Sequence, residues 1–252
     1  MEIPHCLTIR ILKKLLSILI LLSIALSASA SYDRNIIQNL PRVDKNRWHF
    51  GFILGMSFAD FSTTPNESFV DNDGNKWYAA SAGMSPAFNV GMIADLRIVE
   101  YLNVRCTPLL SLGQRNLNYT TFSPEGKIVG EASKVVTQYT AIEVPFYIKY
   151  SAKRYGNVRP YIIAGGGPYF NLNLDPEQPL LLNAFDVQIA FGIGIDIYTE
   201  YFKFCPEIKF GFGLLDQLNQ NHPEIEGTSF EPYTRAVDKL TSRVLTITFN
   251  FE

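Results

Sequence analysis

The sequence has few charged residues and few cysteines. Charged residues make up 18% of its 252 positions, below the roughly one quarter that is typical of soluble domains. The formal net charge of −2 gives no basic excess, so nucleic acid is not an expected partner. The 3 cysteines do not make a disulfide framework, and Cys106 and Cys205 are expected to stay free.

Long apolar runs are also missing, except for one near the N-terminus. Arg10, Lys13 and Lys14 precede the run LLSILILLSIAL, and the small-residue segment SASAS follows it. This order predicts a secretory signal peptide over residues 1–30, cleaved after Ala30. A membrane anchor is the alternative, but the run is shorter than the ~20 residues that a spanning helix needs. The mature chain is therefore expected to leave the cytoplasm.

The mature chain instead has strict alternation of apolar and polar residues. In AFDVQIAFGIGIDIY, Ala184–Tyr198, large apolar residues alternate with small or polar ones such as Asp186, Gln188 and Asp196. A period of two predicts a strand with two different faces. The alternation outlasts a common soluble strand and reaches the roughly nine to eleven residues of a membrane strand. A soluble sandwich and a membrane barrel are both compatible with this segment alone.

Similar alternation recurs along the chain, giving about eight predicted strands and no segment of helical periodicity. Pro108 is expected to mark a bulge in the third strand. In the fifth strand Gly165–Gly167 interrupts the alternation, so its faces stay unassigned. The predicted strands cover residues 48–59, 88–97, 102–115, 142–150, 159–174, 184–198, 202–214 and 242–251.

The links between these strands alternate between short and long. Short links lie at Val99–Glu100, Lys153–Asn157 and Thr199–Tyr201. The long, polar links are Ser62–Met84, Asn116–Val136, Asn173–Asn183 and Asp216–Asp238. This sorting is typical of an outer-membrane barrel and has no reason to occur in a soluble sandwich.

The predicted fold is all-β: an eight-stranded antiparallel transmembrane β-barrel with short periplasmic turns and long extracellular loops. The barrel domain would span residues 47–252, after a periplasmic N-terminal segment over residues 31–46. The expected location is the bacterial outer membrane, with outer-membrane lipid around the barrel. Aromatic girdles are expected at both ends, formed by Trp48, Tyr101, Tyr150, Tyr198 and Tyr201 at the short turns and by Phe61, Tyr119, Tyr169, Phe170 and Phe212 at the long loops.

The polar faces of the strands carry acids and bases in nearly equal number. An eight-stranded barrel is just wide enough for side chains to fill it, and buried charges need partners. We therefore expect a plugged polar lumen and no open pore. The predicted lumen charges are Asp95, Arg97, Arg105, Arg115, Glu143, Lys149, Asp186, Asp196, Glu207, Lys209 and Arg243.

Motifs that would carry catalysis or ligand binding are weak. His49 and His222 are the histidines left in the mature chain, and neither has a neighbour in sequence that suggests a catalytic pair. The segment Asp71–Asn75 has calcium-like acidic spacing, but its glycine comes too early and the bidentate glutamate is missing. Gly165–Gly167 lacks the Lys-Ser/Thr and the helix of a phosphate loop. No catalytic residue, metal, cofactor or small-molecule substrate is predicted, and the chain is not expected to be an enzyme.

Three segments of the mature chain carry a likeness to a known family. They are NLPRVDKNRWHFGFILGMSFADF, EVPFYIKYSAKRYGNVRPYIIAGGG and AVDKLTSRVLTITFNFE, within Asn39–Glu252. In these segments the chain resembles the PorT family of Bacteroidetes outer-membrane proteins. The resemblance implies an outer-membrane barrel that the type IX secretion system needs for protein secretion and gliding motility. It also implies other type IX secretion components as partners, and no catalytic residues.

Three functional hypotheses follow from the sequence. The first is a non-enzymatic accessory barrel of type IX secretion, which holds partners with its long loops or its periplasmic rim. The second is a small structural or adhesive outer-membrane barrel that is not tied to secretion. The third is a membrane enzyme acting on lipid or peptide through His49 or His222.

Overall fold

The computed structural model describes residues 37–252 apart from 67, 72, 130–132, 173–179, 181 and 221–230. The predicted signal peptide, residues 1–30, and His222 lie outside the described residues. Asn39–Glu252 forms one compact unit. Within the described part of the chain, no helix is both long and apolar enough to cross a membrane.

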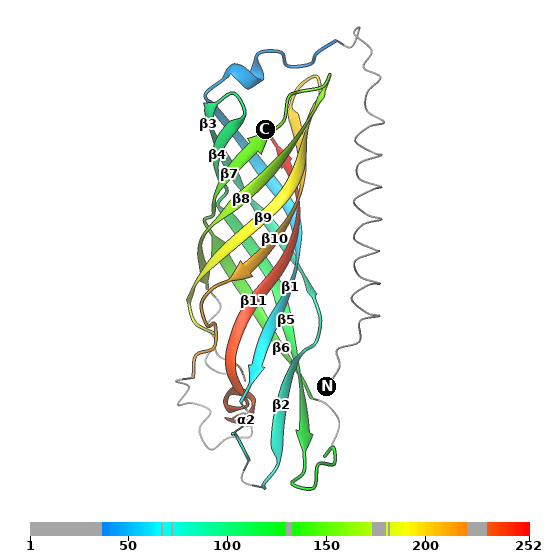
Figure 1. Cartoon of the computed structure of the whole chain (residues 1–252), viewed down its shortest axis with the longest axis vertical. Coiled ribbons are helices and arrows are strands. Elements are labelled where there is room, and N and C mark those ends of the chain that lie inside the picture. The colour runs from blue at the N-terminus through cyan, green and yellow to red at the C-terminus, as the bar shows by residue number, and fades with distance from the viewer. Residues whose placement is uncertain are drawn as a thin grey trace, which may run out of the picture. The chain divides into compact units, whose positions relative to one another are not determined.

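The strands form a single antiparallel sheet that closes on itself (Figure 1). The strands are β1 Trp48–Pro65, β2 Lys76–Ser81, β3 Ser85–Val99, β4 Leu102–Cys106, β5 Leu109–Phe122, β6 Ser133–Glu143, β7 Phe146–Ser151, β8 Val158–Asn171, β9 Phe185–Tyr198, β10 Lys203–Gly213 and β11 Val237–Phe251. The 3₁₀ helix η2 covers Val43–Lys45 and the α-helix α2 covers Glu231–Arg235.

Two pairs of strands each act as one wall of the barrel. β4 and β5 follow one another along β3, and β7 and β6 follow one another along β8. The remaining walls are β1, β3, β8, β9, β10 and β11, and the β8–β9 and β1–β11 ladders complete the circle. The result is the ring of eight antiparallel strands that the alternation predicted, so the fold prediction is confirmed.

The two interrupted walls break at prolines. β4 ends at Cys106 and β5 begins at Leu109, and Pro108 lies in the interruption. The predicted bulge is wrong, because the register against β3 is unchanged across the interruption: Ala94 faces Cys106 and Gly91 faces Leu109, with no extra residue between them. The second break lies at Pro145, between β6 and β7. Proline has no N–H to donate to the ladder, so the hydrogen bonding is interrupted at both places while the register continues on either side.

The glycines of β8 fit against the second break. A Cβ on Gly167 would meet the backbone of Val144 and Pro145, and a Cβ on Gly165 would meet the backbone of Phe146 and Tyr147. Only glycine allows this close approach. The expectation that the glycines disturb the alternation is wrong, because Tyr161 and Ile163 before them and Tyr169 and Asn171 after them are buried in the same phase.

The outward face of the barrel is apolar over a continuous belt. The most exposed apolar side chains on it include Phe50, Met92, Phe146, Ile148, Ile162, Phe191 and Ile193. The belt ends towards the long loops at a collar of polar outward residues. Asp60 and Arg243 face one another in the β1–β11 ladder, and Gln114 and Gln138 do so in the β5–β6 ladder.

The long links contain more regular structure than the sequence predicted. β5 and β6 run on through most of Asn116–Val136, β2 lies in Ser62–Met84 and α2 lies in Asp216–Asp238. Their inward side chains pack into one hydrophobic cluster: Phe61, Ala79, Leu117, Tyr119, Val135, Leu180, Leu182, Leu218, Ala236, Val237 and Leu240. The long-loop end of the barrel is therefore covered by a packed cap, which we call the loop cap.

The predicted aromatic girdles need correction. Phe61, Tyr119, Tyr169 and Tyr198 are buried inside the barrel, because each has the strand phase of the inward residues around it. The other predicted girdle residues face outward and are exposed: Trp48, Tyr101, Tyr150 and Tyr201 at the short turns, and Phe170 and Phe212 at the long loops.

The lipid-facing belt generates a stability prediction. Ile193 is 64% exposed and lies between Ile162 and Ile208 in the neighbouring ladders. Ile193→Arg should lower the free energy of unfolding by about 2–4 kcal/mol, because it places a cation at mid-membrane depth. Urea titration in lipid vesicles measures this. Ile128→Arg is the matched control, since Ile128 is 65% exposed beyond the belt; an equal loss in both variants would contradict the membrane belt.

Candidate functional site

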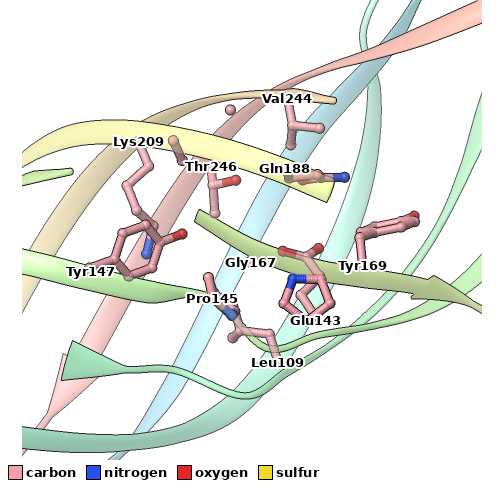
Figure 2. Close-up of a pocket in the computed structure, with 13 residues that line it drawn as sticks. Leu109, Glu143, Pro145, Tyr147, Gly167, Tyr169, Gln188, Lys209, Val244 and Thr246 are labelled. Atoms are coloured by element: carbon pink, nitrogen blue, oxygen red, sulfur yellow. The ribbon is translucent and has the colours of Figure 1, made fainter. Parts of the chain in front are cut away.

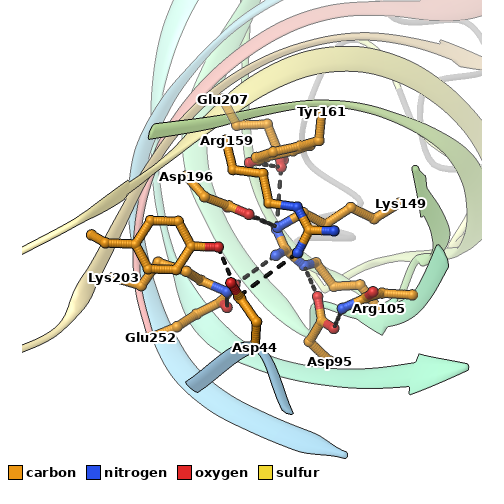
Figure 3. A network of polar contacts seen from close by, with 12 residues as sticks. Asp44, Asp95, Arg105, Lys149, Arg159, Tyr161, Asp196, Lys203, Glu207 and Glu252 are labelled. Atoms are coloured by element: carbon orange, nitrogen blue, oxygen red, sulfur yellow. Dashed lines mark hydrogen bonds and ion pairs between the residues drawn. The ribbon is translucent and has the colours of Figure 1, made fainter. Parts of the chain in front are cut away.

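The candidate site is the lumen of the barrel, where most of the predicted charges lie. Arg105 lies at the centre of the short-turn half of the lumen (Figure 3). Its Nε donates to Asp95 at 2.9 Å, its Nη1 to Glu207 at 3.3 Å and its Nη2 to Glu252 at 2.6 Å. All four side chains are almost completely buried. One guanidinium therefore joins β3, β4, β10 and the residue that follows β11.

Other cations complete the pairing around Arg105. Lys149 Nζ donates to both oxygens of Asp196 at 2.8 Å. Lys209 Nζ donates to Glu207 at 2.5 Å, and Lys203 pairs with Glu252. Since the members are held from several strands, the network crosses the lumen; we call it the Arg105 network.

Tyrosine and asparagine fill the remaining hydrogen-bonding positions of the Arg105 network. Tyr161 Oη donates to Glu207 at 2.8 Å, and Asn103 Nδ2 donates to Asp95. The Tyr161 ring also lies 3.9 Å from Lys149 Nζ. Buried charges are tolerated when they are paired and hydrogen-bonded, which is the situation here.

A segment before β1 crosses the mouth outside the Arg105 network (Figure 1). Asn39 N donates to Asn157 Oδ1 at 2.9 Å, and Arg154 Nη2 donates to the Asn39 carbonyl at 2.5 Å. At the other end, His49 Nε2 lies 2.8 Å from the Val43 carbonyl oxygen. We call residues Asn39–Arg47 the strap. The predicted periplasmic segment, residues 31–46, is therefore part of the barrel unit from Asn39 onward.

Asp44 anchors the middle of the strap. Tyr198 Oη donates to Asp44 Oδ1 at 2.7 Å. Arg154 Nη1 lies 3.6 Å from Asp44 Oδ2, and Arg159 Nη1 lies 3.7 Å from Asp44 Oδ1. The Arg154 guanidinium also stacks 3.5 Å above the Tyr198 ring. The strap is thus tied to strands on the far side of the ring from β1.

Deeper in the lumen lies a small cavity of about 30 Å³ beside Glu143, Tyr147, Gln188 and Lys209 (Figure 2). Ser111 Oγ donates to Glu143 at 2.8 Å. Gln188 Nε2 has no hydrogen-bond partner within the described part of the chain. A space of this size and polarity suits one or two ordered waters and is too small for an organic ligand.

Arg115 occupies the long-loop half of the lumen. Its guanidinium lies 4.6 Å from the Tyr139 ring and 4.9 Å from the Phe61 ring. Arg115 Nη1 donates to Gln217 at 2.9 Å, and Gln217 Nε2 donates to Asp186 at 2.7 Å. Gln217 thus connects the buried cation to the buried carboxylate, directly beneath the loop cap.

The structure places most of the predicted lumen charges inside the ring. Asp95, Arg105, Arg115, Lys149, Asp186, Asp196, Glu207 and Lys209 are buried, and Glu143 lines the cavity. Arg97 is half-buried at the short-turn rim. The assignment of Arg243 to the lumen is wrong: it has the outward phase of Leu245, is exposed, and belongs to the polar collar.

Several members of the site were not predicted from the sequence, among them Lys203, Glu252, Tyr161 and Asp44. Lys203 and Glu252 have the inward phase of their strands, so alternation alone could have identified them. Tyr161 lies in the same strand as Gly165–Gly167, and the faces of that strand stay unassigned from the sequence alone. Asp44 lies outside the predicted barrel, and no signal in the sequence indicates that it turns back onto Arg154 and Arg159.

One family of known proteins matches most of this chain. The family described as outer membrane protein beta-barrel domain matches residues 33–219. The chain belongs to this family. It is accordingly a protein of the outer membrane, which agrees with the apolar belt and the closed sheet. The comparison with curated proteins finds no match.

Two solved outer-membrane barrels are similar to this chain. Neisserial surface protein A is 10% identical, with 81% of this chain and 98% of that chain covered and a TM-score of 0.42. The outer membrane protein OprG from Pseudomonas aeruginosa is 12% identical, with 82% and 96% covered and a TM-score of 0.42. At these identities the likeness concerns the fold alone.

Removing the central cation should destabilise the barrel. Arg105→Met leaves Asp95, Glu207 and Glu252 buried with one partner fewer, which should cost about 3–5 kcal/mol. Arg243→Met is the matched control, since Arg243 is exposed on the outer surface and should tolerate the change. Urea titration of both variants measures the difference, and equal stabilities would show that the Arg105 network does not stabilise the fold.

The filled lumen also predicts that the barrel does not conduct ions. Purified barrel inserted into a planar lipid bilayer should give no sustained ion current, because the strap, the Arg105 network and the loop cap lie in series across the lumen. Stable single-channel currents at moderate voltage would contradict a closed lumen.

Proposed function

We propose that this outer-membrane barrel is a non-enzymatic accessory component of the type IX secretion system and supports the associated gliding motility. The proposal rests on two kinds of support. The likeness of three segments to the PorT family suggests the secretion system. The filled lumen suggests the mode of action, because a barrel without a passage contributes through its surfaces.

The observation that carries the mode of action is the Arg105 network. Its ion pairs connect strands on different sides of the ring at distances of 2.6–3.3 Å around Arg105. Opening a route for a protein chain would separate several buried charges from their partners, and each separation is strongly unfavourable. A role as the conducting channel is therefore disfavoured, and a role in holding other components is favoured.

The arrangement around His49 favours a structural role over a catalytic one. His49 Nε2 contacts the Val43 carbonyl of the strap, so the imidazole helps to position the strap. Within the described residues no group of histidine, cysteine, aspartate and glutamate could hold a metal ion. The proposal assigns to His49 the contact with the strap and no reaction.

The loop cap favours a second candidate, a structural or adhesive barrel at the cell surface. Its packed core includes Phe61, Tyr119 and Leu240, with Trp77 and Tyr233 against it. An ordered surface above the membrane is suited to binding other molecules. This candidate predicts that changes in the cap alter surface binding while protein export stays intact.

Deletion of the gene tests the leading proposal. Cells without the barrel should retain cargo that normally appears in the medium and should lose gliding, because the secretion system lacks a component. Complementation with the wild-type gene should restore both. Immunoblots of medium and cell fractions measure export, and time-lapse microscopy measures gliding.

A variant changed on the outer surface of the barrel serves as the control for the complementation experiment. Arg243→Met, on the outer surface, should restore export like the wild-type gene, which shows that the expressed barrel is functional. Normal export and gliding in the deletion strain would overturn the secretion role and leave the structural or adhesive candidate.

A further inference from the structure

The short-turn end of the barrel has an excess of positive charge. Outside the Arg105 network, the acidic residues described there are Asp44, Glu100 and Glu200. The basic residues are Arg42, Lys45, Arg47, Arg97, Lys153, Arg154 and Arg159. The whole chain has a net charge of −2, so this excess is a property of one end of the molecule.

Four of these basic side chains are exposed and make no ion pair with any other described residue. Arg42, Lys45 and Arg47 lie on the strap, and Lys153 lies in the turn between β7 and β8. Outside the Arg105 network, the ion pairs at this end among the described residues join Asp44 to Arg154 and Arg159. The charges of the four exposed residues are therefore available to a molecule that approaches this end of the barrel from the aqueous phase. We call these four residues the basic rim.

The basic rim is built on a fixed support. Both ends of the strap are hydrogen-bonded to the barrel, through Asn39 to Asn157 at 2.9 Å and through the backbone of Arg47 to Arg97 at 2.9 Å. η2 occupies the middle of the strap. Because the backbone that carries the charges is already ordered, a partner would not have to order it on binding.

The rim region already binds one carboxylate. Asp44 lies between Arg154 and Arg159 and accepts a hydrogen bond from Tyr198. Figure 3 shows Asp44 beside Arg159. This internal contact shows that the chemistry of this end suits carboxylates. It also neutralises the acid that would otherwise repel an acidic partner.

We propose that the basic rim is a docking surface for an acidic segment of a periplasmic protein. That this partner is a component of the secretion system rests on the proposed function. Arg42 and Lys45 lie on the strap, across the mouth of the barrel. Lipid headgroups are expected around its outer wall instead, at the level of the exposed Trp48 and Tyr101. This position favours a protein from the aqueous side over an anionic lipid.

The opposite end of the barrel would not attract such a partner. Its described acidic residues are Asp71, Asp73, Glu125, Asp216, Glu231 and Asp238, and its described basic residues beyond the collar include Lys76, Lys127, Arg235 and Lys239. The sign of the charge thus distinguishes the two ends. Complementary charge of this kind steers association and selects the docking face.

A binding assay on the full mature chain tests the docking surface. The barrel is held in nanodiscs of zwitterionic lipid, and the probe is a fluorescent oligo-glutamate peptide. The rim variant Arg42→Glu/Lys45→Glu/Arg47→Glu should bind the peptide about tenfold more weakly or worse. The control variant Lys76→Glu/Lys127→Glu/Lys239→Glu has the same net charge but changes the opposite end, and should stay within about twofold of wild type.

The assay has outcomes that overturn the inference. Absence of peptide binding by the wild-type chain, or equal weakening in both variants, excludes the basic rim as an acidic-segment site. Nanodiscs that contain phosphatidylglycerol form a further arm. If this lipid abolishes peptide binding to the wild type, the rim is a lipid-headgroup site and the protein-docking inference is wrong.

Cell experiments separate this inference from the proposed function. The rim variant should lower cargo export in the deletion strain, while heat-modifiable mobility shows that it is folded and the control variant exports normally. Export by a folded rim variant at wild-type level would overturn the docking inference and leave the secretion role intact. Normal export in the deletion strain itself would overturn the secretion role, and the peptide assay would still decide whether the rim binds acidic segments.

Discussion

The need to pair every backbone N–H and C=O group within a bilayer governs this structure. Unpaired backbone groups in hydrocarbon are too unfavourable to persist, so the sheet closes on itself through the β8–β9 and β1–β11 ladders. Closure sends alternate side chains into a narrow interior. Apolar residues then face lipid, and the polar residues between them have to satisfy one another inside the ring.

Inside the ring, the polar residues are paired in layers of different chemistry. The strap closes the short-turn mouth, the Arg105 network crosses the lumen behind it, and Arg115 among aromatic rings lies beneath the loop cap. Between these layers Glu143 borders a small polar cavity. The layered filling explains why a chain with so few charged residues places so many of them out of contact with water.

Most of the ring and much of the lumen could be predicted from alternation, because the period of two fixes the face of each residue once one face is known. Asp186, Asp196 and Glu207 illustrate this. Arg243 was misassigned because its outward position lies beyond the apolar belt, where a charge on the outer face is tolerated. The loop cap and the strap could not be predicted, since they depend on contacts between residues far apart in sequence, such as Asp44 with Arg159.

The strap also constrains the order of assembly. Asn39 binds Asn157, in the turn before β8, and Asp44 binds Tyr198, at the end of β9. Both partners lie much later in the chain than β1. The strap therefore has no docking place until β8 and β9 have joined the wall. The strap can therefore dock only late in folding, after most of the ring has formed.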